Sequence, residues 1–359
     1  MEKFTELYSA VVLGTGNNNG INLKGEGQYV FKSYYKLRTK GKNTFTLFYI
    51  NEVESTGNCR LGKKGDGYEI VSAYAAFSPD KEIEEDITPI TFSKKAGKSV
   101  LPGEEYKTDS FEFDYKEDGY MVLSFTVKFE GRAFLPATNE CVATGKVFEN
   151  GKEIWCDNFT LRPCFIGVDK VKTKTVGFFG DSITQGTRTS VDKYEAWAHR
   201  IGNSLDESIS MWNIGMGWSR AYDAVADATF LQKAALCDEV FICFGVNDIR
   251  SGGCEADEVI NNLKKTKELL LKRNENIVVH FLTIPPFNMS VFEEEQRKKV
   301  NDYIRSTEGY FDIAVCLEAD ENGTVREEYM VNSDDSHPNG LGGEAVYKGF
   351  KIWQEKNAW

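Results

Sequence analysis

The sequence predicts a mixed α/β protein, in which an all-β, jelly-roll-like sandwich precedes a flavodoxin-like αβα domain of three layers. Two patterns support this expectation. Up to about residue 165, short apolar runs alternate with turn residues, and from about residue 174 apolar strands alternate with helical stretches. The 359 residues are enough for about two domains, and 41% of them are hydrophobic. We therefore expect a β-sandwich domain at 1–165 and an α/β domain at 174–359, with a linker near 164–173.

The N-terminal half has the composition of antiparallel sheet. Runs rich in Tyr, Phe, Thr and Val occur at 28–35, 44–49 and 119–127, and β-branched and aromatic residues favour strands. Turn signals such as the Glu-Asp-Gly at 117–119 bound these runs. No helical periodicity of useful length interrupts them, so a sandwich of the jelly-roll type is expected.

The C-terminal half alternates buried strands with helices. Strands are expected at 175–179, 209–214, 239–244, 277–284 and 311–316, and helices at 256–273, 292–306 and 341–356. This alternation predicts a parallel sheet covered by helices on both faces. In such sheets the ligand site forms at the carboxyl ends of the strands, so residues that directly follow a strand are the candidates for function.

The heptapeptide at 180–186, Gly-Asp-Ser-Ile-Thr-Gln-Gly, follows the first of these strands. A serine on a sharp turn after a buried strand has an exposed hydroxyl and a free backbone N–H. Ser182 is therefore the predicted nucleophile, and its N–H is a donor for an oxyanion. Asp181 is expected to organise the loop by hydrogen bonding. A Gly-Asp-Ser turn by itself is also common without any function.

A late loop supplies the base. The chain reads Asp334-Asp335-Ser336-His337-Pro338, so His337 is the predicted general base. Asp334, three residues earlier, is the predicted carboxylate that orients the imidazole, because reach favours it over Asp335.

Asn247 follows a third strand within Gly-Val-Asn-Asp, and its side-chain N–H is a second oxyanion donor. A helix cap is the plain alternative for Asn247. Ser182, Asn247 and His337 in this order, each at a strand end or in a late loop, predict one acyl-transfer site. The other histidines, His199 in a helix and His280 in a strand, are expected to be structural. The glycine-rich stretch 14–20 lacks the Lys-Ser/Thr of a phosphate loop and is expected to be a turn.

These motifs resemble the SGNH hydrolases, also called GDSL esterases and lipases, over about half of the chain. The residues 180–182, 245–248 and 334–338 match the first, third and fifth blocks of that family. No Gly-x-Ser-x-Gly elbow is present, which argues against the α/β-hydrolases. A β-sandwich ahead of such a domain resembles the family-2 carbohydrate esterases, which remove acetyl groups from polysaccharides.

The second block departs from the family pattern. The family carries Asn-x-Gly-x-x-Gly, whose last glycine donates its N–H to the oxyanion, whereas this chain has Trp218 in that place and Gly217 before it. The resemblance therefore implies that the amide of either Gly217 or Trp218 completes the oxyanion hole. The indole of Trp218 is also expected to wall the acyl pocket and so to favour small acyl groups.

The expected function is a serine esterase acting on small acyl esters, acetyl first, on carbohydrates. A lipase or thioesterase for longer chains, and a carbohydrate-binding protein with an inert hydrolase domain, are the alternatives. The expected partner is a small-molecule or oligosaccharide ester, with homo-oligomerisation left open, and no metal or organic cofactor is expected. The formal charge of −12 makes nucleic acid and anionic membranes poor partners.

The location is expected to be cytoplasmic. There is no apolar stretch of about 18 residues or more, and the start of the chain has no secretory leader, although a mature fragment of a secreted protein would look the same. The eight cysteines lack Cys-x-x-Cys spacing and are expected to be free thiols.

Overall fold

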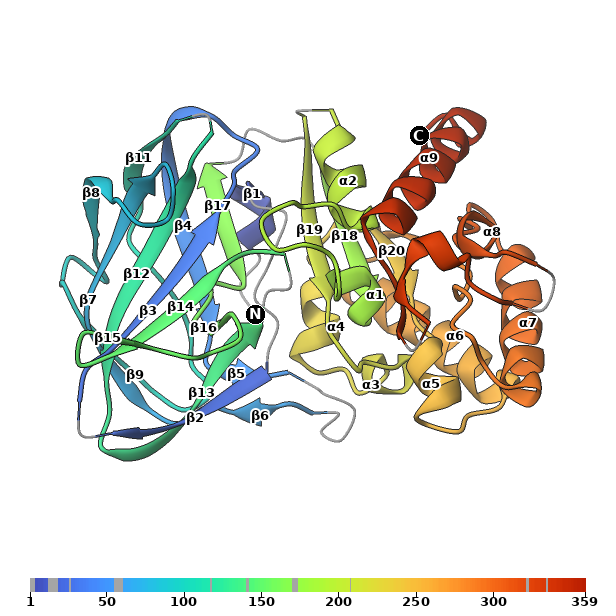
Figure 1. The fold of residues 1–359 in the computed structure, drawn as a ribbon, viewed down its shortest axis with the longest axis horizontal. Helices are drawn as coiled ribbons and strands as arrows, with labels where there is room; N and C mark the ends of the chain where they lie inside the picture. Colours follow the sequence, from blue (N-terminus) through green and yellow to red (C-terminus); the bar gives the residue numbers. More distant parts are fainter. Residues whose placement is uncertain are drawn as a thin grey trace.

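A strand-rich N-terminal region and a C-terminal domain with a parallel sheet lie side by side in the computed structural model, which confirms the expected fold class (Figure 1). The structure describes residues 4–11, 19–25, 27–54, 61–116, 118–139, 142–169, 174–206, 208–320, 323–333 and 335–359. Residues 14–18 of the glycine-rich stretch lie outside this set, as do Cys59 and Cys141. The other cysteines are free, as expected.

The N-terminal region is built from antiparallel sheets. One sheet has the order β15 (Lys152–Ile154), β14 (Gly145–Glu149), β3 (Tyr29–Tyr35), β12 (Tyr120–Lys128), β7 (Tyr68–Ser78) and β8 (Glu85–Ile90), with β9 (Lys98–Val100) also on β7. A second has β1 (Tyr8–Ala10), β17 (Phe165–Asp169), β4 (Gly41–Ile50) and β10 (Glu105–Lys107), with β11 (Phe111–Tyr115) also on β4. Smaller sheets join β16 (Phe159–Thr160), β13 (Gly131–Asn139) and β2 (Asn19–Gly25), and β5 (Glu52–Val53) with β6 (Lys63–Lys64). The jelly-roll topology itself stays a prediction.

Alternation along the strands builds the core of this region. In β11 the residues alternate strictly between buried and exposed, because successive side chains of a strand point to opposite faces. The inward rings of Phe111 and Phe113 pack on Phe45 of β4. The predicted runs at 28–35, 44–49 and 119–127 correspond to β3, β4 and β12.

The parallel sheet of the C-terminal domain has the order β19 (Ile209–Gly215), β18 (Lys174–Gly180), β20 (Glu239–Cys243) and β21 (Val278–Phe281). The first strand in sequence thus lies between the second and the third, which is the flavodoxin-like order. The chain passes from β18 to β19 on one side and then crosses to β20 on the other, so the carboxyl ends of β18 and β20 form the topological switch point where ligands bind in such folds.

Helices cover both faces of this sheet. Phe178 packs on Trp197 of α2 (Trp197–Ser204), whereas the next residue, Phe179, packs on Phe230 of α4 (Thr229–Ala234), because neighbouring strand residues face opposite ways. The remaining elements are α1 (Ser182–Gln185), α3 (Ala221–Ala224), α5 (Val246–Arg250), α6 (Ala256–Arg273), α7 (Val291–Arg305), α8 (Ala314–Leu317), α9 (Gly340–Asn357), the 3₁₀ turns η1 (Phe4–Glu6) and η2 (Glu327–Tyr329), and the hairpin β22 (Met330–Asn332) and β23 (Asp335–Pro338).

The strand expected at 311–316 is wrong. Only Phe311 pairs with Leu282, in a single parallel bridge, and the chain then enters helix α8. Thr283 accepts a hydrogen bond from the N–H of Ala314 at 3.0 Å, and Asp312 accepts one from Val315 at 3.5 Å. These side chains satisfy the first free N–H groups of the helix and so favour a turn over further strand.

The stretch 164–173 is also not simply a linker, since Phe165–Asp169 form strand β17 of the sandwich. Phe165 packs on Phe4 and on Trp212 of β19, which places one aromatic cluster across the contact between the two parts. A buried ion pair also crosses this contact, from Glu54 to Lys233 of α4. The two parts therefore share a core.

The loop after α1 is held by the N-terminal region. Asp192 of this loop accepts hydrogen bonds from Lys81 and from the hydroxyl of Thr144, both at 2.6 Å. The N–H of Asp192 donates to the carbonyl of Val142 at 2.6 Å. The sandwich thus fixes a segment that begins four residues after Ser182.

Candidate functional site

Ser182 lies at the switch point of the parallel sheet. Strand β18 ends at Gly180, and a Cβ there would collide with the side chain of Thr184 and the carbonyl of Cys243, so only glycine allows this tight turn. Asp181 caps α1, its carboxylate accepting from the N–H of Ile183 at 2.9 Å, which is the loop-organising role expected of it. Ser182 is the first residue of α1 and is half-buried.

The structure brings Ser182 and His337 together from positions 155 residues apart in the chain. Ser182 Oγ lies 2.9 Å from His337 Nε2, within hydrogen-bonding reach. On the other side of the imidazole, His337 Nδ1 lies 2.5 Å from Asp335 Oδ1. A hydroxyl, an imidazole and a carboxylate in line are the arrangement that activates a serine for attack.

The carboxylate on His337 differs from the one expected. Asp334 lies outside the described residues, and the position beside Nδ1 that we assigned to it is occupied by Asp335. Asp335 and His337 both belong to strand β23, where residues two apart point to the same face. A carboxylate three residues before a histidine reaches the imidazole when the chain makes a turn. Residues 335–338 are extended instead, so the carboxylate two residues before His337, that of Asp335, is the one on the same face.

Burial and charge together set the protonation of this pair. Burial lowers the pKa of His337 below its ordinary value of 6.5. The hydrogen bond that His337 donates to Asp335 opposes that shift, while the charges of Arg188 and Arg250 add to it. Burial acts to raise the pKa of Asp335, but hydrogen bonds from His337 and Arg188 outweigh it and the pKa is lowered. His337 is therefore neutral, and Asp335 ionised, at neutral pH, as a general base and its orienting carboxylate must be.

Asn247 lies in the first turn of α5, directly after β20, and is buried. Its side-chain N–H donates to the carbonyl of Ser219 at 3.2 Å, which fixes the amide against the second-block loop. An amide nitrogen carries two hydrogens, so one remains to be offered to a substrate oxygen.

The second-block loop lies beside the nucleophile. A Cβ built on Gly217 would lie 4.0 Å from Ser182 Cβ. The N–H of Gly217, however, already donates to Gln185 Oε1 at 3.0 Å. Trp218 follows with a φ of +66°, a left-handed conformation that is strained for a residue other than glycine. Its indole is 68% exposed, so it does not pack as the wall of a closed pocket.

Five residues around the site escaped the sequence analysis: Arg188, Gln185, Asp248, Arg250 and Phe287. Asp248 is buried and accepts from the N–H groups of Ala221 and Tyr222 at 2.9 and 3.2 Å, which anchors α3 beside the site. Burial raises its pKa to about 6, and that of Asp181 to about 7. Asp248 adjoins Asn247 in the third block and was within reach of the motif, whereas nothing in the sequence pointed to Arg188 or Phe287.

The histidines expected to be structural have partners outside the site. His280 Nε2 lies 2.6 Å from Glu239, and His280 Nδ1 lies 2.7 Å from the carbonyl of Gly309. His199 is fully buried in α2, 3.4 Å from the amide of Asn213.

In the described part of the chain no group of three or more His, Cys, Asp or Glu side chains is placed to hold a metal ion. Across the same residues, no helix is both long and apolar enough to cross a membrane.

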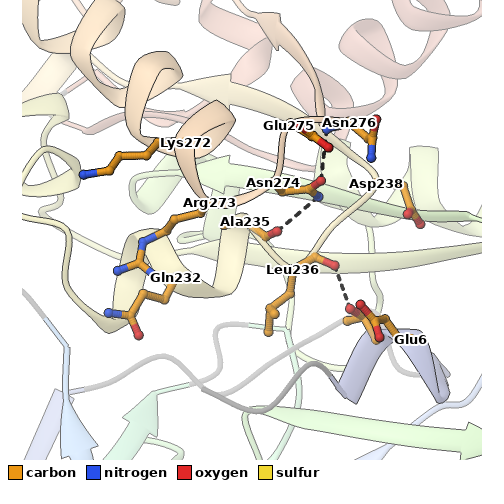
Figure 2. Close-up of a pocket in the computed structure, with 11 residues that line it drawn as sticks. Glu6, Gln232, Ala235, Leu236, Asp238, Lys272, Arg273, Asn274, Glu275 and Asn276 are labelled. Atoms are coloured by element: carbon orange, nitrogen blue, oxygen red, sulfur yellow. Dashed lines mark hydrogen bonds between the residues drawn. The ribbon is translucent and has the colours of Figure 1, made fainter.

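A polar surface pocket of about 590 Å³ lies elsewhere, between η1 and the C-terminal domain (Figure 2). Asn274 holds one side of it by donating to the carbonyl of Ala235 at 3.3 Å. In its lining, Asp238 directly precedes β20 and Asn276 lies two residues before β21, so the pocket lies at the amino ends of these strands. Ser182 and Asn247 lie at the opposite, carboxyl ends, and this pocket is therefore not the site that the motifs build.

Comparison with known protein families finds a match for most of the C-terminal domain. Residues 178–345 match the model of the GDSL-like Lipase/Acylhydrolase family. No curated protein matches the chain.

Solved structures similar to the chain include proteins of related description. One is a member of the lipolytic protein G-D-S-L family from Veillonella parvula, with 20% identity, 50% of this chain and 96% of that chain covered, and a TM-score of 0.40. A carbohydrate esterase of family 3 from Talaromyces cellulolyticus is 17% identical in sequence and has a TM-score of 0.40. The match covers 52% of this chain and 100% of that chain. A family two carbohydrate esterase from Cellvibrio japonicus is 10% identical in sequence and has a TM-score of 0.39. The match covers 96% of this chain and 94% of that chain. Over residues 178–345 the chain is thus similar to the GDSL-like lipases and acylhydrolases, and the protein is a carboxylic ester hydrolase.

Proposed function

We propose that the protein is a serine esterase that hydrolyses small acyl esters, acetyl esters of carbohydrates first, with Ser182, His337 and Asp335 as its triad. The 2.9 Å contact between Ser182 Oγ and His337 Nε2 at the switch point supports this proposal most directly. The same contact argues against the alternative of a carbohydrate-binding protein whose hydrolase domain is inactive. Binding alone would not require the imidazole of His337 to lie within hydrogen-bonding distance of the Ser182 hydroxyl.

In the proposed mechanism, His337 accepts the Ser182 proton while Oγ attacks the ester carbonyl carbon. The oxyanion that forms receives hydrogen bonds from the Ser182 N–H, the free N–H of the Asn247 side chain and an amide of the second block. His337 then donates its proton to the leaving alcohol, and the acyl group stays on Oγ. Water, deprotonated by the same imidazole, releases the acid and restores the serine.

The Trp218 amide is the better candidate for the second-block donor. The N–H of Gly217 is occupied by Gln185 Oε1, and an oxyanion would have to displace that acceptor. Among the described residues, by contrast, the N–H of Trp218 has no acceptor. Gly217 remains the alternative if Gln185 moves when substrate binds.

The small-acyl and carbohydrate parts of the proposal rest on the aromatic residues beside the site. Trp218 presents a largely exposed indole next to Gly217, and Phe287 is half-exposed beside His337. Flat aromatic faces suit sugar rings, whereas a long acyl chain needs an enclosed apolar pocket. The lipase or thioesterase reading predicts the opposite chain-length preference.

We also propose the division into a sandwich domain and an α/β domain, at 1–165 and 174–359, with the first extended to residue 169 so that it includes β17. The sandwich holds the loop after α1 through Asp192, so its proposed role includes positioning that loop beside the site. A cytoplasmic location and homo-oligomerisation stay predictions.

The test of the function is hydrolysis of p-nitrophenyl esters of increasing acyl length by the wild type and by Ser182→Ala. Acetate should be the best substrate, and Ser182→Ala should lose at least about 10³-fold in kcat without loss of folding. Near-normal activity in a folded Ser182→Ala protein would remove the central proposal. A preference for octanoyl esters would leave the triad in place and replace the acetyl proposal by the lipase alternative.

A further inference from the structure

Two arginines flank His337. Arg250 ends helix α5, and its guanidinium lies 5.2 Å from the centre of the Phe287 ring. That ring in turn lies edge-to-face against His337, with 5.1 Å between the ring centres. Arg188, in the loop after α1, donates to Asp335 at 2.6 Å from the other side. Both guanidinium groups are near enough to disfavour the charged form of His337.

Arg250 differs from the other described arginines of the C-terminal domain. Each of the others bonds a carboxylate or a backbone carbonyl: Arg188, Arg200, Arg220, Arg273, Arg297, Arg305 and Arg326. Arg250 has neither kind of partner among the described residues, although the chain has 55 acidic residues against 43 basic ones. Arg250 is thus an exposed cation near His337 that has no carboxylate or carbonyl partner among the described residues, and this feature needs an explanation.

The contact with Phe287 leaves the hydrogen-bonding edge of Arg250 open. The ring has no carboxylate or carbonyl oxygen to accept a hydrogen bond, and the N–H donors of Arg250 find no such acceptor among the described residues. The ring therefore restrains the group without satisfying its donors. A restrained guanidinium with free N–H donors is suited to bind a carboxylate through two parallel hydrogen bonds.

The chemistry of the triad indicates which part of the substrate meets Arg250. His337 must hand its proton to the oxygen of the leaving alcohol, so the alcohol lies on the imidazole side of the site. Phe287 packs against that imidazole, and Arg250 packs against Phe287. A charged group on the alcohol, and not on the small acyl group, would therefore come near Arg250.

We infer that the alcohol part of the substrate carries a carboxylate, as in an acetylated sugar acid, and that Arg250 binds it; this inference rests on the proposed esterase function. Arg188 is held by Asp335 and adds attraction at longer range. The substrate class is thus narrowed from acetylated carbohydrates to acetylated uronic acids.

The test compares two substrates that differ only at C6, a mono-acetylated methyl glucuronoside with a carboxylate there and the matching methyl glucoside with a neutral hydroxymethyl group. The wild type should prefer the glucuronoside by about tenfold or more in kcat/KM, the scale of one charge-assisted hydrogen-bonding contact. Arg250→Gln should remove most of this preference, and Arg250→Lys should restore part of it. Arg273→Gln, which removes an arginine paired with Asp227 at the far pocket, should keep the preference. Raising the salt concentration should weaken it.

The outcomes separate this inference from the function on which it rests. Equal turnover of both substrates by a wild type that still depends on Ser182 would overturn the inference and leave the esterase standing. A folded Arg250→Gln protein that loses the same activity on both substrates would also overturn it, because Arg250 would then act on His337 alone. Binding of free glucuronate, measured by calorimetry, should be tighter than that of glucose and weaker in Arg250→Gln. Absence of ester hydrolysis on any substrate would instead sink the proposed function.

Discussion

At the residue scale, His337 depends on one carboxylate, and the two neighbouring candidates can be separated. Asp335→Ala should lower kcat strongly, because it removes the 2.5 Å contact that orients the imidazole, whereas Asp334→Ala should have a small effect. Asp335 also raises the pKa of His337 against the effect of burial. Its removal should therefore shift the acid limb of kcat/KM, which in the wild type already lies below pH 6.5, to still lower pH.

The measurement is a pH–rate profile of both variants with p-nitrophenyl acetate. The proposed mechanism needs His337 in its neutral form, so kcat/KM falls as the pH drops through the pKa of the imidazole. A lower pKa therefore moves this fall to lower pH. A silent Asp335→Ala and a damaging Asp334→Ala would restore the carboxylate that the motif first indicated.

The residues of the site were predictable to different degrees. Ser182 and His337, which the structure brings within 2.9 Å, could be predicted because a nucleophile and a base need particular side chains at the ends of strands. The choice between Asp334 and Asp335 could not be made from the sequence, because it depends on whether the segment is a strand or a turn, and a four-residue strand such as β23 leaves no clear periodicity. Arg250 lies one helical turn after Asn247, yet only the fold shows that Phe287, from a distant loop, joins it to His337.

At the scale of elements, the turn that carries Trp218 combines strain and exposure. Trp218→Gly should leave the free energy of unfolding unchanged or raise it by about 1 kcal/mol, because glycine adopts a φ of +66° without the cost borne by other residues. If the indole limits the acyl group, the same variant should hydrolyse octanoyl esters better relative to acetyl esters, by roughly 1 kcal/mol or more.

Urea unfolding and acyl-length profiles measure the two effects. Trp155→Gly is the matched control, since Trp155 is 88% exposed in the N-terminal region and its loss should leave the acyl preference unchanged. An unchanged profile in Trp218→Gly would mean that another part of the site sets acyl length.

Element prediction succeeded where the pattern was long or wholly apolar. The helix predicted at 256–273 has the bounds of α6, and four of the five strands predicted after residue 174 exist. The fifth failed at 311–316 because the apolar run Phe-Asp-Ile-Ala-Val-Cys serves a helix as well as a strand, and side-chain caps from Thr283 and Asp312 decided the outcome.

For the whole molecule, the buried pair of Glu54 and Lys233 ties the two parts together. Lys233→Met should destabilise the protein by about 3 kcal/mol or more, because it leaves a buried carboxylate without its cation. Lys233→Met combined with Glu54→Leu should recover part of that loss. Lys265→Met, which breaks an exposed pair with Glu268, should cost about 0–1 kcal/mol. Equal losses in the buried and exposed single variants, measured by urea unfolding, would contradict this account.

The anchoring of the loop after α1 has a consequence for how this architecture can evolve. Asp192 ties the loop to Lys81 and Thr144 of the sandwich, and the same loop carries Arg188, which contacts Asp335. A recombination event that exchanged the sandwich for another module would therefore release Arg188, which contacts His337 through Asp335. The two halves are expected to be inherited together, and drift on one side of the contact should be matched by compensating change on the other.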